Sequence, residues 1–248
     1  MRSKPIILAV AILLSGGTLE SLAQSELSPG QHLANEMRQT QLLNYAEISG
    51  SLKTKGRRGK RSSMALRLTT AIKDGQWQSI FQATDPTSGA ISQLTILRSP
   101  EKGPQYYLAS APKKDSPIEQ GELLAPDDAM ASFAGSNFWM VDLGLEFFYW
   151  PKQTLLRDAR IKMRKGISCF VLESQRDSTT DDGYSRVRSW ISRDHGGLIY
   201  AEAYGANGKQ IKTFEVSDVE KINGEWKLKE LRIRNEIARS TTELIFNN

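Results

Sequence analysis

The stretch from Trp190 to Phe246 reads WISRDHGGLIYAEAYGANGKQIKTFEVSDVEKINGEWKLKELRIRNEIARSTTELIF. Apolar runs alternate in it with turn signals, namely Asp194-His195-Gly196-Gly197, Ala206-Asn207-Gly208-Lys209 and Ile222-Asn223-Gly224-Glu225. Asn-Gly is the strongest short-range hairpin signal, because both central residues of a type I′ turn need a positive φ. The pattern therefore predicts a meander of antiparallel strands, and the curved sheet that it makes must bury one face.

The last strands of this stretch carry a change of phase. Trp226 and Leu228 share one phase of the alternation, but Leu231 and Ile233 hold the opposite one. A β-bulge adds one residue to a strand and so restores the inward face. We therefore expect a bulge near Glu230.

The rest of the chain continues the pattern around one helix. Ser28-Pro29-Gly30-Gln31 is a capping-box sequence with proline at the first helical position, which predicts an amphipathic helix from Pro29 to about Gln41. Period-two alternation and turn signals predict front strands over residues 45–53, 64–72, 77–83, 91–97 and 106–109. Later strands are predicted around Ala159, Ile161 and Met163, and as a hairpin of 169–174 with 186–191 around the polar loop 177–183.

The middle of the chain is aromatic instead. Pro126-Asp127-Asp128 opens a short helix that runs through Phe133 and is stopped by Gly135. The stretch from Phe138 to Trp150 is interpreted as a turn and a short helix with little polar surface. Such a helix is either plain core or the lid of an apolar cavity between the helices and the concave sheet. The residues that would line or close this cavity are Phe138, Trp139, Met140, Leu143, Phe147 and Trp150.

The first residues predict export. Arg2 and Lys4 precede an apolar run from Pro5 to Leu14, and Ser21-Leu22-Ala23 offers small residues before a cleavage site. This is the pattern of a secretory signal peptide over residues 1–23. The apolar run is shorter than the ~20 residues of a membrane-spanning helix. We expect a soluble protein of the Gram-negative periplasm, in which residues 24–248 form one domain.

The net charge limits the classes of binding partner, and the cysteine content indicates what stabilises the fold. Cleavage would remove Arg2, Lys4 and Glu20, so the formal net charge would fall from +5 to +4. That modest excess suits anionic lipid surfaces or acidic partners, whereas export argues against nucleic acid. The sole cysteine, Cys169, sits in an apolar strand pattern and cannot form an internal disulfide. We expect a buried, inert thiol and a fold that rests on its core.

No motif in the sequence carries catalytic or metal chemistry. His32 in the first helix and His195 in a turn have no spacing that would bring them together with carboxylates, so structural or surface roles are expected. The loop 177–183 resembles a calcium loop only in part, because Asp182 stands where an EF-hand needs glycine, and a solvated loop is the simpler interpretation. Asp127 and Asp128 could be paired catalytic carboxylates, but helix capping explains them more simply. We expect no enzyme activity, no cofactor and no bound metal.

Residues 53–61 carry the densest basic run of the chain. Its cations are Lys53, Lys55, Arg57, Arg58, Lys60 and Arg61. The simpler interpretation is a hairpin tip that its charge keeps soluble. The alternative is a docking patch for phospholipid head groups or an acidic partner, since each exposed cation near an anionic membrane contributes ~1 kcal/mol.

With its elements in this order, the chain resembles the LolA-like family of outer-membrane lipoprotein-sorting proteins. The residues that carry the resemblance are Gly135-Ser136-Asn137-Phe138 through Asp142-Leu143, and the stretches 188–193, 204–209, 219–226 and 241–246. The resemblance extends over nearly all of residues 24–248. Its motifs are mainly structural, and the segment from Ser136 to Asp142 is more apolar here than is usual in the family.

The resemblance implies a mainly β (α+β) fold: a strongly curved antiparallel sheet that forms an incomplete β-barrel, covered by a few helices. It implies an apolar cavity for the acyl chains of lipoproteins or other lipids. It also implies an inner-membrane transporter as donor and an outer-membrane receptor as acceptor. No family residue that controls cargo transfer is carried over, because no motif here matches one.

The leading hypothesis is therefore a monomeric periplasmic carrier that binds acyl chains without catalysis. The alternative is a structural or protein-interaction module of the cell envelope, whose barrel is filled by its own side chains. An envelope hydrolase is a third hypothesis, and it would need a catalytic triad that the sequence does not display.

Overall fold

The computed structural model describes residues 27–39, 47–113, 116–118, 121–157, 163–177, 183–222 and 225–247. The predicted signal peptide lies outside these residues, so the division into a leader (1–23) and one domain (24–248) stays a prediction. The turn at Asn223-Gly224, the strand residues Ala159 and Ile161, and most of the loop 177–183 also lie outside the described residues.

Two meanders supply the strands. The N-terminal half of the sheet consists of β1 (Glu47–Lys55), β2 (Arg61–Lys73), β3 (Gln76–Thr84), β4 (Ile91–Arg98), β5 (Gln105–Ala111) and β6 (Glu122–Leu123). The C-terminal half consists of β7 (Lys152–Leu155), β8 (Met163–Arg164), β9 (Ile167–Gln175), β10 (Arg186–Ser192), β11 (Leu198–Tyr204), β12 (Gln210–Ile222), β13 (Glu225–Asn235) and β14 (Ser240–Asn247).

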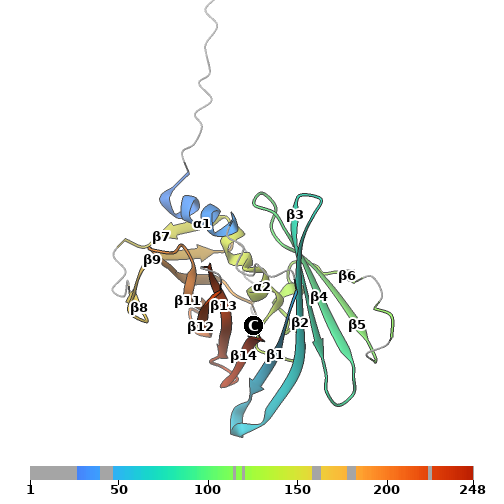
Figure 1. Cartoon of the computed structure of the whole chain (residues 1–248). Coiled ribbons are helices and arrows are strands. Elements are labelled where there is room, and N and C mark those ends of the chain that lie inside the picture. Colours follow the sequence, from blue (N-terminus) through green and yellow to red (C-terminus); the bar gives the residue numbers. More distant parts are fainter. Residues whose placement is uncertain are drawn as a thin grey trace, which may run out of the picture.

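The strands of the described residues form one antiparallel sheet in the order β6-β5-β4-β3-β2-β1-β14-β13-β12-β11-β10-β9-β7, with β8 paired to β9. β1 and β14 pair from Ser49 opposite Asn247 to Lys55 opposite Thr241, so the first and last strands join the two meanders. The sheet bends strongly between its halves and stays open, with β6 and β7 at its two ends (Figure 1). The expected fold class, a mainly β incomplete barrel with few helices, is confirmed.

The helix α1 (Pro29–Gln39) crosses the outer end of β7 and β9 (Figure 1). Its capping box is present: the Ser28 N–H donates to Gln31 Oε1 at 2.9 Å, and the Gln31 N–H donates to Ser28 Oγ at 3.2 Å. Its buried face includes Ala34 and Met37. A Cβ atom at Gly30 would lie 2.4 Å from the carbonyl oxygen of Gln153 in β7, so only glycine lets the helix approach this closely.

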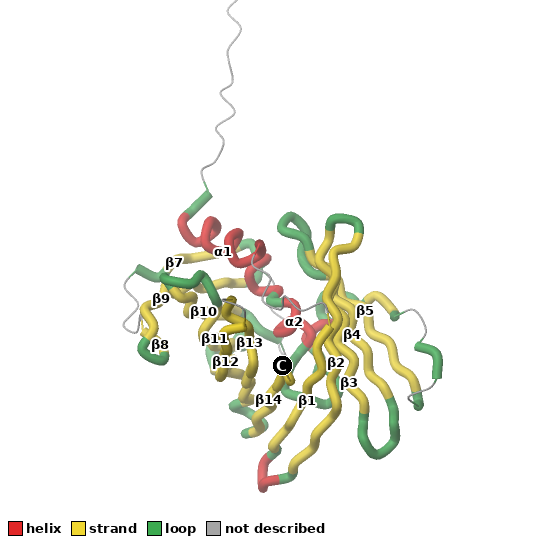
Figure 2. The backbone as a smooth tube through the Cα atoms, viewed as in Figure 1, coloured by secondary structure: helices red, strands yellow, loops and turns green. Residues whose placement is uncertain are grey.

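The other helices of the described residues are short (Figure 2). Three of them lie between β6 and β7 in the chain. They are η2 (Asp128–Met130), α2 (Met140–Gly144) and η3 (Glu146–Tyr149), while η1 (Arg57–Gly59) forms the tip of the β1–β2 hairpin. The predicted helix from Pro126 through Phe133 is reduced to the single turn η2. The expectation that Asp127 caps this turn is wrong, because its side chain makes no capping bond and lies 3.2 Å from Arg176 instead.

Two sequence expectations about the last strands have different outcomes. The bulge near Glu230 is confirmed, because the β12–β13 register shifts around Asp218 and thereby places Leu228 and Leu231 both in the core. The turn at Asn207-Gly208 is not of type I′, because only Gly208 has a positive φ of 74°. The Asn207 side chain instead accepts the N–H of Lys209, and the register shifts beside Tyr204, as in a longer turn with a glycine bulge.

The main core fills the concave face of the sheet. It combines strand residues of both halves, such as Leu68, Phe81 and Ile233, with the aromatic residues Phe133 and Phe138 of the chain between them. A second, smaller cluster lies on the opposite face of β9 and β10 and consists of Cys169, Val171 and Trp190. The expectation of a buried Cys169 is confirmed, and burial raises the pKa of its thiol.

Candidate functional site

Residues 136–150, the middle segment, lie between the two halves of the sheet and are bonded to β14. The backbone N–H and the side-chain amide of Asn137 both donate to Thr242 Oγ1, at 2.9 Å and 3.1 Å. Ser240 Oγ donates to Asn137 Oδ1 at 2.7 Å. Buried polar groups need such partners, so these bonds set where the middle segment meets the sheet.

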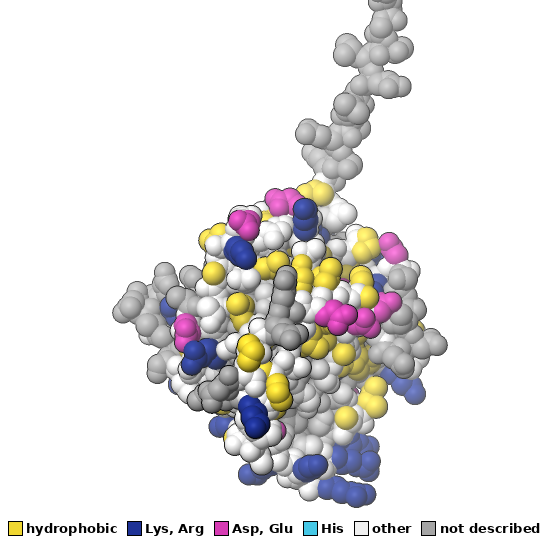
Figure 3. All heavy atoms as spheres, turned by 90° about the vertical axis from the view of Figure 1, so that its right-hand side faces the viewer, with side chains coloured by type: hydrophobic (Ala, Val, Ile, Leu, Met, Phe, Trp, Pro, Cys, Tyr) yellow, Lys and Arg dark blue, Asp and Glu magenta, His cyan; other side chains and the backbone are white. Residues whose placement is uncertain are grey.

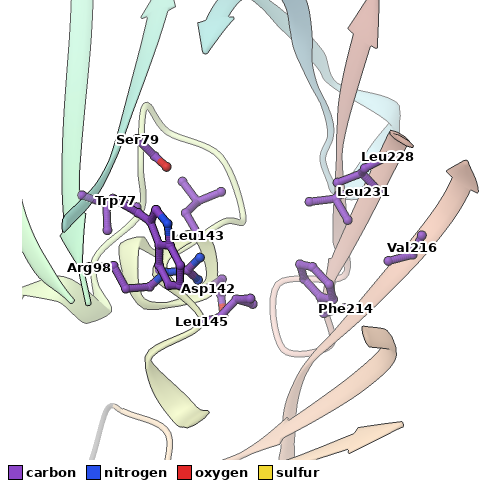
Figure 4. Close-up of a pocket in the computed structure, with 12 residues that line it drawn as sticks. Trp77, Ser79, Arg98, Asp142, Leu143, Leu145, Phe214, Val216, Leu228 and Leu231 are labelled. Atoms are coloured by element: carbon purple, nitrogen blue, oxygen red, sulfur yellow. The ribbon is translucent and has the colours of Figure 1, made fainter. Parts of the chain in front are cut away.

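A small cavity, the central cavity, opens between the halves of the sheet beside α2. Figure 4 shows Trp77 and Arg98 of β3 and β4 on one side, and Phe214 and Leu231 of β12 and β13 on the other. The remaining lining residues are Ser79, Ile96, Asp142, Leu143, Gly144, Leu145, Val216 and Leu228. Its volume is about 40 Å³, which corresponds to roughly three water molecules. Typical ligand sites are about 300–1,000 Å³, so an acyl chain needs this cavity to widen.

The middle segment is held against β12 by a group of four residues, which we call the Asp142 cluster: half-buried Trp139 and the buried residues Asp142, Tyr184 and Lys212. Asp142 Oδ2 accepts the Trp139 N–H at 2.8 Å and lies 3.2 Å from Lys212 Nζ. Asp142 Oδ1 accepts the Tyr184 hydroxyl at 2.9 Å. Lys212 is 1% exposed, and its ammonium lies 3.5 Å from the centre of the Trp139 ring, which stacks on Tyr184.

Burial dominates the protonation of this cluster. It lowers the pKa of Lys212 to about 8, an effect that the Asp142 carboxylate opposes. Burial, together with the Asp142 charge, raises the pKa of the Tyr184 hydroxyl well above its usual value. At neutral pH the ammonium and the carboxylate therefore form an ion pair inside the core, where loss of one partner would leave the other charge uncompensated.

Further bonds connect the middle segment to the ends of the sheet. The Tyr149 hydroxyl donates to the Ser99 carbonyl after β4 at 2.9 Å, and Arg38 Nε of α1 donates to the Phe148 carbonyl at 2.9 Å. Buried Gln153 donates to the carbonyls of Phe147 and Trp150 at 3.0 Å and 2.8 Å. Because the bonds come from α1, from the residue that follows β4 and from β7, the segment spans the opening between both halves of the sheet.

The six residues predicted to form an apolar cavity occupy different environments. Leu143 lines the central cavity. Phe138, Phe147 and Trp150 are buried in the main core, and half-buried Trp139 belongs to the Asp142 cluster. Met140 borders a separate depression of about 340 Å³ that Leu124 and Met130 also line. Their assignment to a ligand site stays a prediction.

Sequence reasoning did not identify Lys212, although a signal for it exists. Lys212 precedes Phe214 and Val216 by two and four residues, so it shares their inward phase in β12. A lysine at an inward position requires an anion nearby, which only the fold can provide. Arg98 follows Ile96 in the same way, and burial lowers the pKa of its guanidinium, which lies 5.2 Å from the Trp77 ring.

The other candidate residues take structural positions. His32 is on the exposed surface of α1, 3.6 Å from Glu36, and the His195 N–H donates to Ser192 Oγ in a turn. Among the described residues, no group of three or more histidine, cysteine, aspartate or glutamate side chains could hold a metal ion. No helix within the described ranges has the length and apolar character needed to cross a membrane.

The basic run forms the end of the β1–β2 hairpin, and we call residues 53–61 the basic hairpin. All six of its cations are exposed. Lys and Arg side chains gather at the lower end of the molecule in Figure 3, the end at which this hairpin turns in Figure 1. Its use as a docking patch stays a prediction.

A family model described as an uncharacterized protein family matches residues 118–248, slightly more than half of the chain. A comparison with curated proteins finds no match.

Several solved structures share the fold. A DUF1329 family protein from Desulfovibrio piger is 20% identical, with a TM-score of 0.67, over 88% of this chain and 90% of that one. A putative outer membrane lipoprotein-sorting protein domain from Vibrio parahaemolyticus is 17% identical, with a TM-score of 0.69, over 88% and 90%. A LolA superfamily protein from Nitrosomonas europaea is 14% identical, with a TM-score of 0.61, over 90% and 93%. At such identities the likeness concerns the fold alone.

Proposed function

The chain belongs to the family of uncharacterized proteins whose model covers residues 118–248, and from this premise we propose that it is a periplasmic carrier of acyl chains. It takes the chains of lipoproteins or other lipids into the central cavity and moves them between the inner and outer membranes, as a monomer and without catalysis. An inner-membrane transporter loads it, and an outer-membrane acceptor unloads it. The lipoprotein-sorting description of the Vibrio structure supports this choice of cargo.

The observation that carries the proposal is the position of the central cavity. It lies between two halves of an open sheet, and its walls are mainly apolar side chains such as Phe214, Leu228 and Leu231. Burial contributes about 0.8 kcal/mol per methylene, so ten buried methylenes contribute about 8 kcal/mol. That free energy corresponds to a dissociation constant of about 1 μM before ordering costs.

Loading requires the middle segment to move, because the cavity is only about 40 Å³ in this conformation. Leu145, which lines the cavity between α2 and η3, supports such a movement. Its φ of 51° is in the left-handed region, which costs a non-glycine residue roughly 1–2 kcal/mol. Displacing the segment would release this strain and leave Leu143 and Leu145 in contact with cargo.

Lipid uptake tests the proposal. Protein purified from its host is examined by native mass spectrometry with lipid extraction, and delipidated protein is titrated with a fluorescent fatty acid. Val216→Trp places a large ring at the cavity wall and should weaken uptake at least tenfold. Val219→Trp, an exposed position of the same strand, is the matched control and should bind normally. Absence of bound lipid together with absence of uptake would exclude the carrier.

The small cavity also favours a second candidate, a structural or protein-interaction module whose barrel is filled by its own side chains. In that case the aromatic residues of the middle segment serve stability alone. Phe147→Ala would then lower the free energy of unfolding by about 3–5 kcal/mol, while wild-type protein binds no fatty acid. Uptake by the wild-type protein therefore distinguishes the two candidates.

A further inference from the structure

The basic hairpin faces away from the central cavity. Leu52 is buried and Thr54 bonds to Thr242 on the inner face, so Lys53 and Lys55 project from the convex face. Arg61 lies opposite Lys55 in the β1–β2 register and shares its face. These cations are therefore directed away from the central cavity and from any cargo in it.

The charge of this hairpin is not balanced by neighbouring acids. No aspartate or glutamate occurs between Glu47 and Asp74. Glu243 of β14 is the acid opposite Lys53, but its carboxylate lies 3.1 Å from Arg232. The ion pairs found among the described residues include none of the six cations of the hairpin.

Hydroxyl groups accompany the cations. Ser63 lies opposite Lys53 and Thr241 lies opposite Lys55 in the strand registers, so these two hydroxyls share the face of the cations. They line an open groove of about 680 Å³ together with Lys53, Lys55, Arg61, Arg232 and Glu243. Ammonium, guanidinium and hydroxyl groups are the donors that proteins use to bind phosphate oxygens. The side chains thus fit an array of phosphate groups.

The shape of the hairpin decides between a membrane and a protein as the partner. Its tip, η1, is a single turn that the Gly56 N–H closes onto the Lys60 carbonyl at 2.7 Å. None of the large apolar side chains exposed in the described residues belongs to the hairpin. Protein interfaces have a buried apolar or aromatic centre, which this surface lacks, whereas cations spread over a projecting tip suit a lattice of lipid phosphates.

We propose that the basic hairpin docks the protein on membranes that contain anionic phospholipids, with its cations on the head-group phosphates. This inference does not depend on the cargo, because docking uses the convex face and cargo would use the concave one. It gives the protein a fixed orientation on the bilayer, with the hairpin tip directed at the lipid surface.

Vesicle binding tests the inference. Binding is measured by co-sedimentation with vesicles of phosphatidylethanolamine and phosphatidylglycerol, and with neutral phosphatidylcholine vesicles. The triple variant Arg57→Gln, Lys60→Gln, Arg61→Gln should bind the anionic vesicles on the order of a hundredfold more weakly. The matched triple variant Lys73→Gln, Lys152→Gln, Lys209→Gln removes three exposed lysines elsewhere and should lose much less.

Raising the salt from about 50 mM to about 300 mM should weaken wild-type binding, because exposed charges are screened. Equal binding to neutral vesicles, or equal losses in the two triple variants, would overturn the inference. So would displacement by inorganic phosphate at an ionic strength where chloride has no effect, since that indicates a site for free phosphate. Fatty-acid uptake by the first variant should remain normal, so failure of docking and failure of the carrier are separate results.

Discussion

Breaking the ion pair of the Asp142 cluster should destabilise the protein strongly and asymmetrically. Asp142→Asn leaves the Lys212 ammonium buried beside the Trp139 ring without an anion. The loss of stability has an upper limit, because Lys212 can instead give up its proton and stay buried as a neutral amine. Deprotonating a lysine of ordinary pKa at pH 7 costs about 5 kcal/mol. Removal of one partner of a buried pair typically costs about 3–5 kcal/mol, so we expect about 4 kcal/mol.

Lys212→Met should cost less, about 2 kcal/mol, because the Asp142 carboxylate keeps two other donors, the Trp139 N–H and the Tyr184 hydroxyl. The double variant has neither charge. Its loss of stability should therefore be smaller than the sum of the losses in the two single variants. We expect a coupling free energy of about 2–3 kcal/mol from the double-mutant cycle.

The free energy of unfolding of all four proteins is measured at pH 7 by urea titration, followed by tryptophan fluorescence and circular dichroism. Lys209→Met, at an exposed lysine of the neighbouring turn, is the control and should change stability by less than about 0.5 kcal/mol. A coupling free energy below about 0.5 kcal/mol lies within the scatter of independent sites and would refute the argument.

Three further predictions concern the same fold. The free energy of unfolding should rise by roughly 2 kcal/mol between pH 8 and pH 9.5, because the folded protein releases the Lys212 proton near pH 8 whereas the unfolded chain keeps it up to the usual lysine pKa. Urea titrations across this pH range test the prediction. An equal rise of stability with pH in Lys212→Met would contradict it. Thr242→Val removes the acceptor of both Asn137 donors and should cost about 1–3 kcal/mol in urea unfolding, unlike Thr241→Val; equal losses in the two variants would be evidence against this anchor. Gly30→Ala should lower the melting temperature although alanine favours helices, because its Cβ meets the Gln153 carbonyl; an unchanged or higher melting temperature would show that α1 can shift without cost.

Local signals in the chain were sufficient for several elements. The capping box at Ser28 and Gln31 predicted the start of α1, because both partners of its hydrogen bonds are three residues apart. The phase change between Leu228 and Leu231 predicted a bulge. Residues three apart in a regular strand face opposite sides of the sheet, so both can be buried only if the register shifts between them. The turn at Asn207 was predicted in place but not in type, since the φ angles depend on the register of β11 and β12.

The site depended on contacts that no local pattern contains. Asp142 and Lys212 are 70 residues apart, and the inward phase of Lys212 gives no indication of which acid it meets. The residues of the middle segment were predicted as buried or as a lid, but only the packing assigns Leu143 to the cavity and Phe138 to the core. The volume of a cavity depends on how the surrounding side chains pack in three dimensions, so the sequence alone does not define it.

By itself the sequence determined the two meanders, because alternation with period two and turn residues act over a few positions. It also determined the basic hairpin, because its six cations lie within nine consecutive residues of the chain. Only the tertiary structure decided that β1 pairs with β14, that Asp142 meets Lys212, and that the central cavity measures about 40 Å³. The physical reason is that these features depend on residues far apart in the chain, which the bend of the sheet brings together. Local sequence patterns extend over only a few positions and carry no information about such contacts.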